Sequence, residues 1–215
     1  MGNIDENYFK MPSGYKNNSI EDIIGDGENL LLKMKPKKSA YKFNSIVAFL
    51  PIALIWLIID TGFICGLALT GSVPKIVWAI IIPFFAVHLL PVWIFIGNIV
   101  KAGRAWKNLE YAFTDRRIII RSGVIGINIA NIYYTDIKGV NLKIGLFDRL
   151  FKVGDIYIKA ADQSKVLYDL EEPYFNLSRI QKIVLDLKTD VYFPNDLRPE
   201  TNSGYKTKYN PEDES

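Results

Sequence analysis

The sequence predicts a membrane hairpin of two α-helices followed by a mainly-β domain of antiparallel strands that ends in a helix. Three observations predict this fold class. Residues 44–100 hold two long apolar runs that are separated by a short turn. From residue 108 onward, short apolar stretches alternate with polar turns, which is typical of strands. Residues 173–187 then return to a helical spacing of apolar residues.

Each apolar run exceeds the roughly 20 residues that an α-helix needs to cross a bilayer. Lipid offers no hydrogen-bond partners to the backbone, so a spanning segment must pair its backbone groups internally, as helices do. We expect a first helix over about Ser45–Thr70, a turn over Gly71–Pro74 and a second helix over about Lys75–Val100. A buried helical pair in a soluble protein is the alternative, but runs of this length are rare in soluble cores.

Basic residues flank the hairpin at its two open ends. Lysines precede it at positions 33, 35, 37, 38 and 42, and basic residues follow it at 101, 104 and 107. The region of the turn carries only Lys75. Because positive flanks stay on the cytoplasmic side of a membrane, we expect both termini in the cytoplasm and a multi-pass protein of the cell membrane. The lipid bilayer is thus the first expected partner.

The segments around the hairpin and the domain are more polar. Residues 1–25 lack hydrophobic periodicity, and we expect them to be disordered, like the proline-containing tail over 189–215. Residues 26–43 contain a predicted short strand at Leu30–Met34. Pro36 ends this strand, and the lysines that follow it form a basic juxtamembrane segment.

The soluble domain is predicted over residues 106–188. Its strand-like stretches lie at 108–114, 117–121, 127–134, 140–144, 155–159 and 165–170. Short strands separated by polar turns favour an antiparallel sheet or a small barrel. Pro173 suits the first position of a helix. The apolar residues that line one face of this helix are Leu177, Ile180, Ile183, Val184 and Leu187, so we expect it to pack on the sheet.

Three runs in this domain match motifs of a known family. The run Tyr111–Ile118 reads YAFTDRRI and is similar to the motif Y-x-(L/I)-T-(D/N)-x-R-(L/I). The runs Tyr134–Val140 and Gly145–Ile156 resemble two further motifs, although Lys152 stands where glycine is often found. These runs resemble the bacterial pleckstrin-homology-like (PH-like) family, and so do the hairpin and the stretch Glu28–Pro36 before it.

The resemblance implies a strongly bent antiparallel sheet closed by the C-terminal helix, to which Glu28–Met34 adds a strand from the far side of the hairpin. We therefore expect a membrane-anchored PH-like interaction or scaffold protein that displays a cytoplasmic domain at the membrane surface. The alternatives are a sensor of anionic lipid headgroups and an oligomeric transport or proton-coupled component.

Composition argues against other classes of protein. The chain has one histidine, one cysteine and no CxxC, Walker-type or HExxH motif, so we expect no enzyme, no catalytic residue, no metal site and no cofactor. The net charge is only +3 and the basic residues are spread along the chain, which argues against a nucleic-acid partner.

Two ionisable residues lie near the middles of the predicted spans. Asp60 and His88 are offset by about 4.5 Å along antiparallel helices, so a hydrogen-bonded pair is expected. An ionisable side chain at mid-membrane costs at least about 2.5–3.5 kcal/mol on insertion scales and usually faces a partner. Such a pair is either a structural contact between the helices or a proton relay or ion site.

A GxxxG motif, Gly62 and Gly66, lies on the first span, and small residues at this spacing let another helix approach closely. The two glycines lie about 160° and 120° around the helix from Asp60. If Asp60 meets His88, the glycines face lipid or another subunit. If they hold the second span, Asp60 needs another partner. Both arrangements favour a homo-oligomer or a membrane protein partner, and close packing within the hairpin is the alternative.

Arg116, Arg117 and Arg121 flank the first predicted turn of the domain. Eukaryotic PH domains often bind phosphoinositide headgroups with basic residues near this place, so the resemblance implies a possible headgroup site here. Arg117 and Arg121 share one face of a strand, which suits the recognition of phosphate. A solvated charged face is the alternative.

Overall fold

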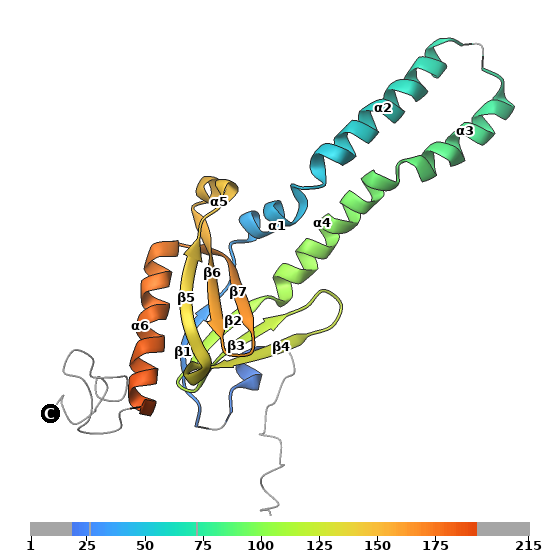
Figure 1. The fold of residues 1–215 in the computed structure, drawn as a ribbon. Helices are drawn as coiled ribbons and strands as arrows, with labels where there is room; N and C mark the ends of the chain where they lie inside the picture. The colour runs from blue at the N-terminus through green and yellow to red at the C-terminus, as the bar shows by residue number, and fades with distance from the viewer. Residues whose placement is uncertain (1–18, 26, 72, 193–215) are drawn as a thin grey trace, which may run out of the picture.

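Residues 19–25, 27–71 and 73–192 are described by the computed structural model. They form a domain of two sheets from which a long helical hairpin projects (Figure 1). In chain order the elements are η2 (Glu21–Ile23), β1 (Leu30–Met34), α1 (Lys38–Ile46), α2 (Leu50–Leu69), α3 (Lys75–His88), α4 (Leu90–Asn108), β2 (Glu110–Thr114), β3 (Arg117–Ser122), β4 (Asn128–Tyr133), η3 (Tyr134–Asp136), β5 (Ile137–Lys143), α5 (Leu146–Phe151), β6 (Val153–Ala160), β7 (Ser164–Glu171) and α6 (Pro173–Tyr192).

Two antiparallel sheets build the domain. Strands β1 to β4 pair in chain order in the first sheet, and β5 to β7 pair in chain order in the second. Alternate residues of β2 and β3, such as Tyr111, Phe113 and Ile118, point into one shared core. The helix α6 runs along the second sheet and adds Ile180 and Val184 to that core (Figure 1). Antiparallel sheets with a C-terminal helix agree with the predicted PH-like fold.

The strand β1 ties the chain before the hairpin to the domain after it. It pairs antiparallel with β2, with Leu32 opposite Phe113 and Met34 opposite Tyr111. This pairing confirms the strand that the sequence predicts before the hairpin. The hairpin is therefore an insertion between the first two strands of the first sheet, and both of its ends are fixed to that sheet.

Residues 19–25 cover the outer face of the first sheet, so the disorder expected over 1–25 is wrong for this part. Ala112 and Ile119 point away from the main core, and Ile20 packs on them with its side chain fully buried. An apolar outer face requires such cover. The helix α6 likewise continues to Tyr192 rather than ending at 188, with Thr189 buried. Residues 1–18 and 193–215 lie outside the described residues.

Each arm of the hairpin consists of two helices rather than the single helices expected over 45–70 and 75–100. The first arm breaks between α1 and α2, and the second breaks at Leu89 between α3 and α4. Pro51 and Pro91 lie at the starts of α2 and α4. A proline has no N–H to continue the hydrogen bonds of a preceding helix, and each break lies just before one of these two residues, whereas Pro83 lies inside α3 without ending it.

The helix α2 is long and apolar enough to span a membrane, with a mean hydropathy of 2.3. The helices α3 and α4 meet the same criterion only as a pair, bent by 47° at their junction. The described residues thus hold one candidate span, or two if the bent pair is counted as one. Large apolar side chains on these helices face outward, for example Ile58 at 68% and Ile76 at 71% exposed.

Gly154 marks the point where the start of α6 crosses β6. A Cβ atom at this position would lie 2.8 Å from the Cβ of Pro173 and 3.0 Å from Cδ1 of Leu142. We expect Gly154→Ala to lower the free energy of unfolding by about 1–3 kcal/mol, because overpacking forces neighbouring atoms apart. Gly139→Ala on β5 is the matched control, because its Cβ would meet no atom within 4 Å. Equal urea midpoints for the two variants would contradict this packing.

Candidate functional site at the base and middle of the hairpin

Contacts between the two arms hold the base of the hairpin. The helices α1 and α4 pack side by side here. The indole N–H of Trp106 donates to the carbonyl oxygen of Pro36 at 2.8 Å. The ammonium group of Lys35 lies 4.6 Å from the centre of the Trp106 ring, within the range of a cation–π contact, and donates to the carbonyl oxygen of Lys107 at 3.1 Å. These contacts join the chain entering the hairpin to the chain leaving it.

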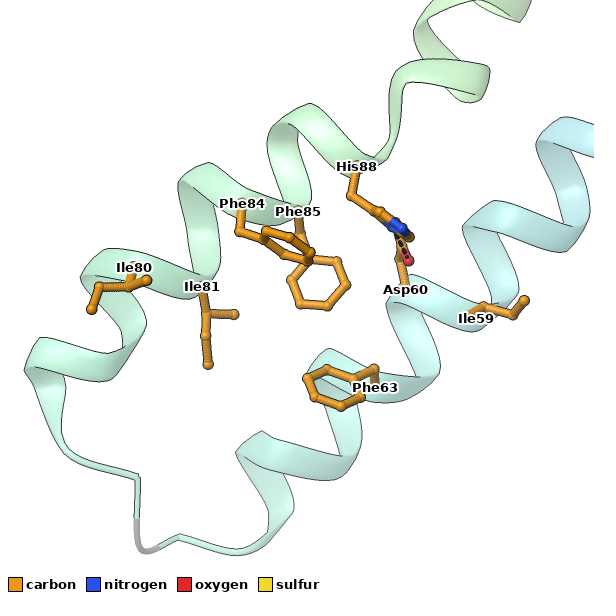
Figure 2. Close-up of a pocket in the computed structure, with 8 residues that line it drawn as sticks. All are labelled: Ile59, Asp60, Phe63, Ile80, Ile81, Phe84, Phe85 and His88. Atoms are coloured by element: carbon orange, nitrogen blue, oxygen red, sulfur yellow. Dashed lines mark hydrogen bonds and ion pairs between the residues drawn. The ribbon is translucent and has the colours of Figure 1, made fainter.

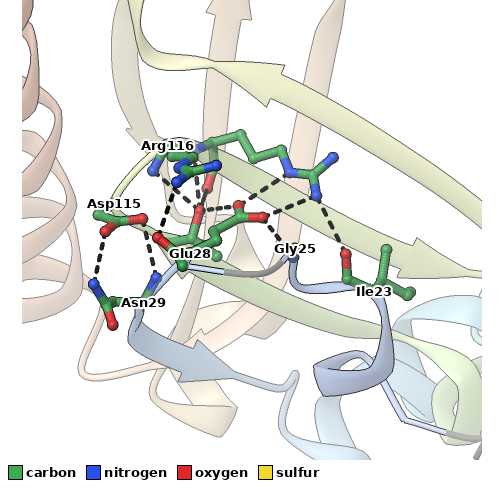
Figure 3. Close-up of polar contacts among 9 residues, drawn as sticks. Ile23, Gly25, Glu28, Asn29, Asp115 and Arg116 are labelled. Carbon is green, nitrogen blue, oxygen red and sulfur yellow. Dashed lines mark hydrogen bonds and ion pairs between the residues drawn. The ribbon is translucent and has the colours of Figure 1, made fainter. Parts of the chain in front are cut away.

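A buried ion pair joins the segment before β1 to β3 (Figure 3). Nε and Nη2 of Arg117 each donate to an oxygen of Glu28 at 3.0 Å. The hydroxyl of Thr114 donates to Glu28 at 2.6 Å, and the backbone N–H of Gly25 donates at 2.9 Å. Burial acts to raise the pKa of Glu28, but these hydrogen bonds outweigh it and lower the pKa to about 2.

The arginines that the sequence predicts as a headgroup site each contact another group of the protein. Arg117 is held by Glu28, and Nη2 of Arg116 donates to the carbonyl oxygen of Gly27 at 2.9 Å. Arg121 is 8% exposed and lies 3.5 Å from an oxygen of Glu110. The structure therefore does not gather these three side chains into an open basic pocket.

Asp60 and His88 meet in the middle of the hairpin (Figure 2). Nδ1 of His88 lies 2.9 and 3.0 Å from the two carboxylate oxygens of Asp60. The Asp60 side chain is almost fully buried, whereas that of His88 is 40% exposed. The ring of Phe84 stacks on His88. A cavity of about 470 Å³ opens beside the pair, and its remaining lining is apolar: Ile59, Phe63, Ile80, Ile81, Phe84 and Phe85.

This arrangement joins the two arms at the bend of the second arm, because His88 is the last residue of α3. The GxxxG glycines lie elsewhere on α2. A Cβ atom at Gly62 or Gly66 would meet no heavy atom within 4 Å, so these residues face away from the second arm. Of the two arrangements that the sequence allows, the structure has the one in which Asp60 meets His88.

An acidic cluster that no sequence pattern predicts lies where α1 meets the domain. It is formed by the buried Asp148 and Asp169 and the half-buried Asp155. The side-chain amide of Asn44 on α1 donates to Asp148 at 3.0 Å and to Asp169 at 2.6 Å. Asp155 accepts from the backbone N–H of Asp169 at 2.9 Å. Burial, and then the charges of Asp155 and Asp148, raise the pKa of Asp169 to about 6, although the Asn44 hydrogen bond opposes this.

No spacing in the sequence signals this acidic cluster. Its members come from α5, β6 and β7, and Asn44 lies on the other side of the hairpin insertion. Within the described ranges, no group of three or more His, Cys, Asp or Glu residues is placed to hold a metal ion. The acidic cluster is joined to α1 by the Asn44 hydrogen bonds and thus lies at the joint between the hairpin and the domain.

Comparison with known families agrees with the fold. A family model described as "Bacterial PH domain" matches residues 45–189, which include the hairpin and nearly all of the domain after it. The strand β1 precedes the matched range but pairs in the same sheet. No curated protein and no solved structure matched the chain. Since the family model covers more than half of its length, the chain belongs to the bacterial PH domain family.

Proposed function

We propose that this protein is a membrane-anchored interaction module that displays its PH-like domain at the cytoplasmic surface of the cell membrane, as a scaffold and not as an enzyme. The insertion of an apolar hairpin between β1 and β2 is the observation that carries this proposal. A PH-like domain suggests an interaction or lipid-binding module. The hairpin gives it a place to act.

The surface of the hairpin suits a bilayer. In α2 the buried residues are Ala53 and Asp60, and the large side chains face outward. Apolar surface left in water forgoes about 25 cal/mol for each Å² that lipid would cover. Two spans, α2 and the bent pair α3–α4, would place both ends of the hairpin on the same side of the membrane as the domain.

Such a protein would act by holding its PH-like domain at a fixed position on the membrane surface. Both ends of the hairpin continue into neighbouring strands, β1 and β2, so the height and direction of the domain follow those of the hairpin. Tethering raises the effective concentration of weak contacts at the membrane surface by fixing the binding face near its partners. We propose that the outward face of Gly62 and Gly66 contributes a contact to a second copy or to another membrane protein.

Replacing residues 47–99 with a short Gly/Ser linker tests the role of the hairpin. The full chain should stay in membranes during alkaline carbonate extraction and should crosslink in cells to itself or to a specific membrane partner. The linker variant should be soluble and lose these crosslinks. Extraction of the full chain by carbonate would overturn the proposal. Gly62→Leu/Gly66→Leu should abolish the crosslinks if the glycine face carries the contact, and a full chain that stays monomeric would count against oligomerisation.

The contact between Asp60 and His88 beside a cavity supports a second candidate, an oligomeric proton-coupled component. Under the display proposal, this contact only joins the two arms. We then expect Asp60→Asn and His88→Ala to retain the wild-type crosslinks, with a loss of about 1 kcal/mol in hairpin stability for the alanine variant. Proton flux into liposomes containing the protein, abolished by both variants at normal expression, would instead favour the proton-coupled candidate.

A further inference from the structure

The helix α5 lies beside α1, at the end of the domain from which the hairpin leaves (Figure 1). The ring of Phe43 on α1 contacts the rings of Phe147 and Phe151 on α5, with centroids 5.2 Å apart in both cases. Only three residues separate α1 from the candidate span α2. A membrane that holds α2 therefore lies close to this end of the domain.

Two leucines of α5 face outward, on a different side of the helix from the phenylalanines that pack on α1. Leu146 and Leu150 are 80% and 74% exposed, whereas Asp148 between them is buried. Asp148 is held inward by the backbone N–H of Gly145 at 2.7 Å and by the Asn44 amide. A helix at a water-exposed surface places its apolar face inward and its charges outward. The outward leucines indicate that an apolar phase covers α5.

Basic side chains lie next to these leucines. Arg149 and Lys152 line a pocket of about 400 Å³ together with Tyr174 and Glu172 at the start of α6. Among the described residues, neither Arg149 nor Lys152 forms an ion pair with a carboxylate, Glu172 included. Tyr174 is 72% exposed, and tyrosine is enriched where membrane meets water.

We propose that α5 and the start of α6 form a second contact with the membrane, which rests on the proposed anchoring by the hairpin. Leu146 and Leu150 enter the boundary between headgroups and acyl chains, and Arg149 and Lys152 bind the headgroups of anionic lipids. The contact fixes the tilt of the domain on the membrane and makes it depend on the charge of the lipids. This site is separate from Arg116, Arg117 and Arg121, each of which contacts another group of the protein.

Nitroxide labels on the full chain in lipid nanodiscs test this proposal. Single cysteines at Leu150, at Leu185 on α6 and at Ile58 on α2 carry the label, in a Cys65→Ser background. Leu185 is the matched control, because it is an exposed apolar residue (58%) far along α6 from the start of that helix. Collisions with oxygen report burial in lipid, and collisions with a water-soluble nickel complex report exposure to water.

In discs that contain phosphatidylglycerol, we expect the labels at 150 and 58 to collide mainly with oxygen and the label at 185 with nickel. Each basic residue near an anionic leaflet favours the membrane-bound position over the water-exposed one about fivefold. The double variant Arg149→Ala/Lys152→Ala should therefore lower the ratio of lipid-contacting to water-exposed label at position 150 by about 25-fold. In pure phosphatidylcholine the two alanines should have little effect.

The three labels separate the possible failures. If the label at position 58 contacts lipid but the label at position 150 is as exposed to water as the label at 185, the second contact is overturned and the anchoring stands. If 58 is itself exposed to water, both the anchoring and the second contact are overturned. If 150 is shielded from both reagents, a protein surface covers α5 and the assignment to lipid is overturned.

Discussion

Replacing Glu28 with alanine is expected to lower the free energy of unfolding of the domain by about 3 kcal/mol, because it leaves the guanidinium of Arg117, whose side chain is only 20% exposed, without a counter-charge. The same substitution removes the acceptor for the Thr114 hydroxyl and for the backbone N–H of Gly25. Unprotected amides should appear first in β1 and β3, the strands nearest to this ion pair, when hydrogen exchange is measured in detergent.

Glu21→Ala is the control for this variant. Glu21 also pairs with a cation, Lys33, but both side chains are substantially exposed, so little change in stability is expected. Equal exchange protection in the two variants would show that the buried pair does not stabilise the domain.

Acid should have a similar effect on the wild type. The pKa of Glu28 is lowered from 4.5 to about 2 in the folded state. Its stabilisation is therefore complete above pH 4.5 and is lost as the pH falls towards 2, a change of about 3 kcal/mol. The Glu28→Ala variant should lack this part of the acid dependence.

Asp169→Asn is expected to raise the free energy of unfolding, in contrast to Glu28→Ala, by stabilising the joint between α1 and the domain. The pKa of Asp169 is raised from 3.8 to about 6, so the folded state binds its proton more tightly than the unfolded state does. The free energy of unfolding of the wild type should therefore rise as the pH falls from above 6 to about 4, by up to about 3 kcal/mol.

Asparagine at position 169 is neutral at every pH, and its oxygen still accepts from Asn44. It also tolerates the left-handed backbone of this residue, where φ is 48°. We expect a gain of about 1–3 kcal/mol near pH 7.5, little difference near pH 3, below both pKa values, and no effect from the control Asp162→Asn in the exposed β6–β7 turn. Loss of stability at both pH values would mean that the charged form of Asp169 holds the joint together.

The sequence predicts those parts of the fold that depend on local patterns. The short apolar stretches at 108–114 and 117–121, separated by a polar turn, predict β2 and β3, and the spacing in Leu177–Leu187 follows from a helix packed on a sheet. The ends of the helices in the hairpin were less predictable. Hydropathy gives the extent of an apolar run, whereas Pro51 and Pro91 set where its helices break.

Contacts between distant segments escaped prediction. Nothing in the spacing of Arg117 pairs it with Glu28, which lies before the hairpin, so a basic residue that looks free for phosphate is neutralised by the fold. The same reason hides the acidic cluster around Asp169 and the outward-facing leucines of α5. The contact of Asp60 with His88 could be predicted, because two ionisable residues at matching positions along antiparallel apolar helices favour one another.

Labelling of single cysteines from the two sides of the membrane tests the proposed anchoring most directly. Lys75→Cys at the turn and Leu185→Cys in the domain, both in a Cys65→Ser background, are exposed to a maleimide that does not cross membranes. In intact spheroplasts, position 75 should react at once and position 185 only after the membrane is permeabilised. Reaction of both positions from the same side would contradict a hairpin that crosses the membrane twice and displays its domain in the cytoplasm.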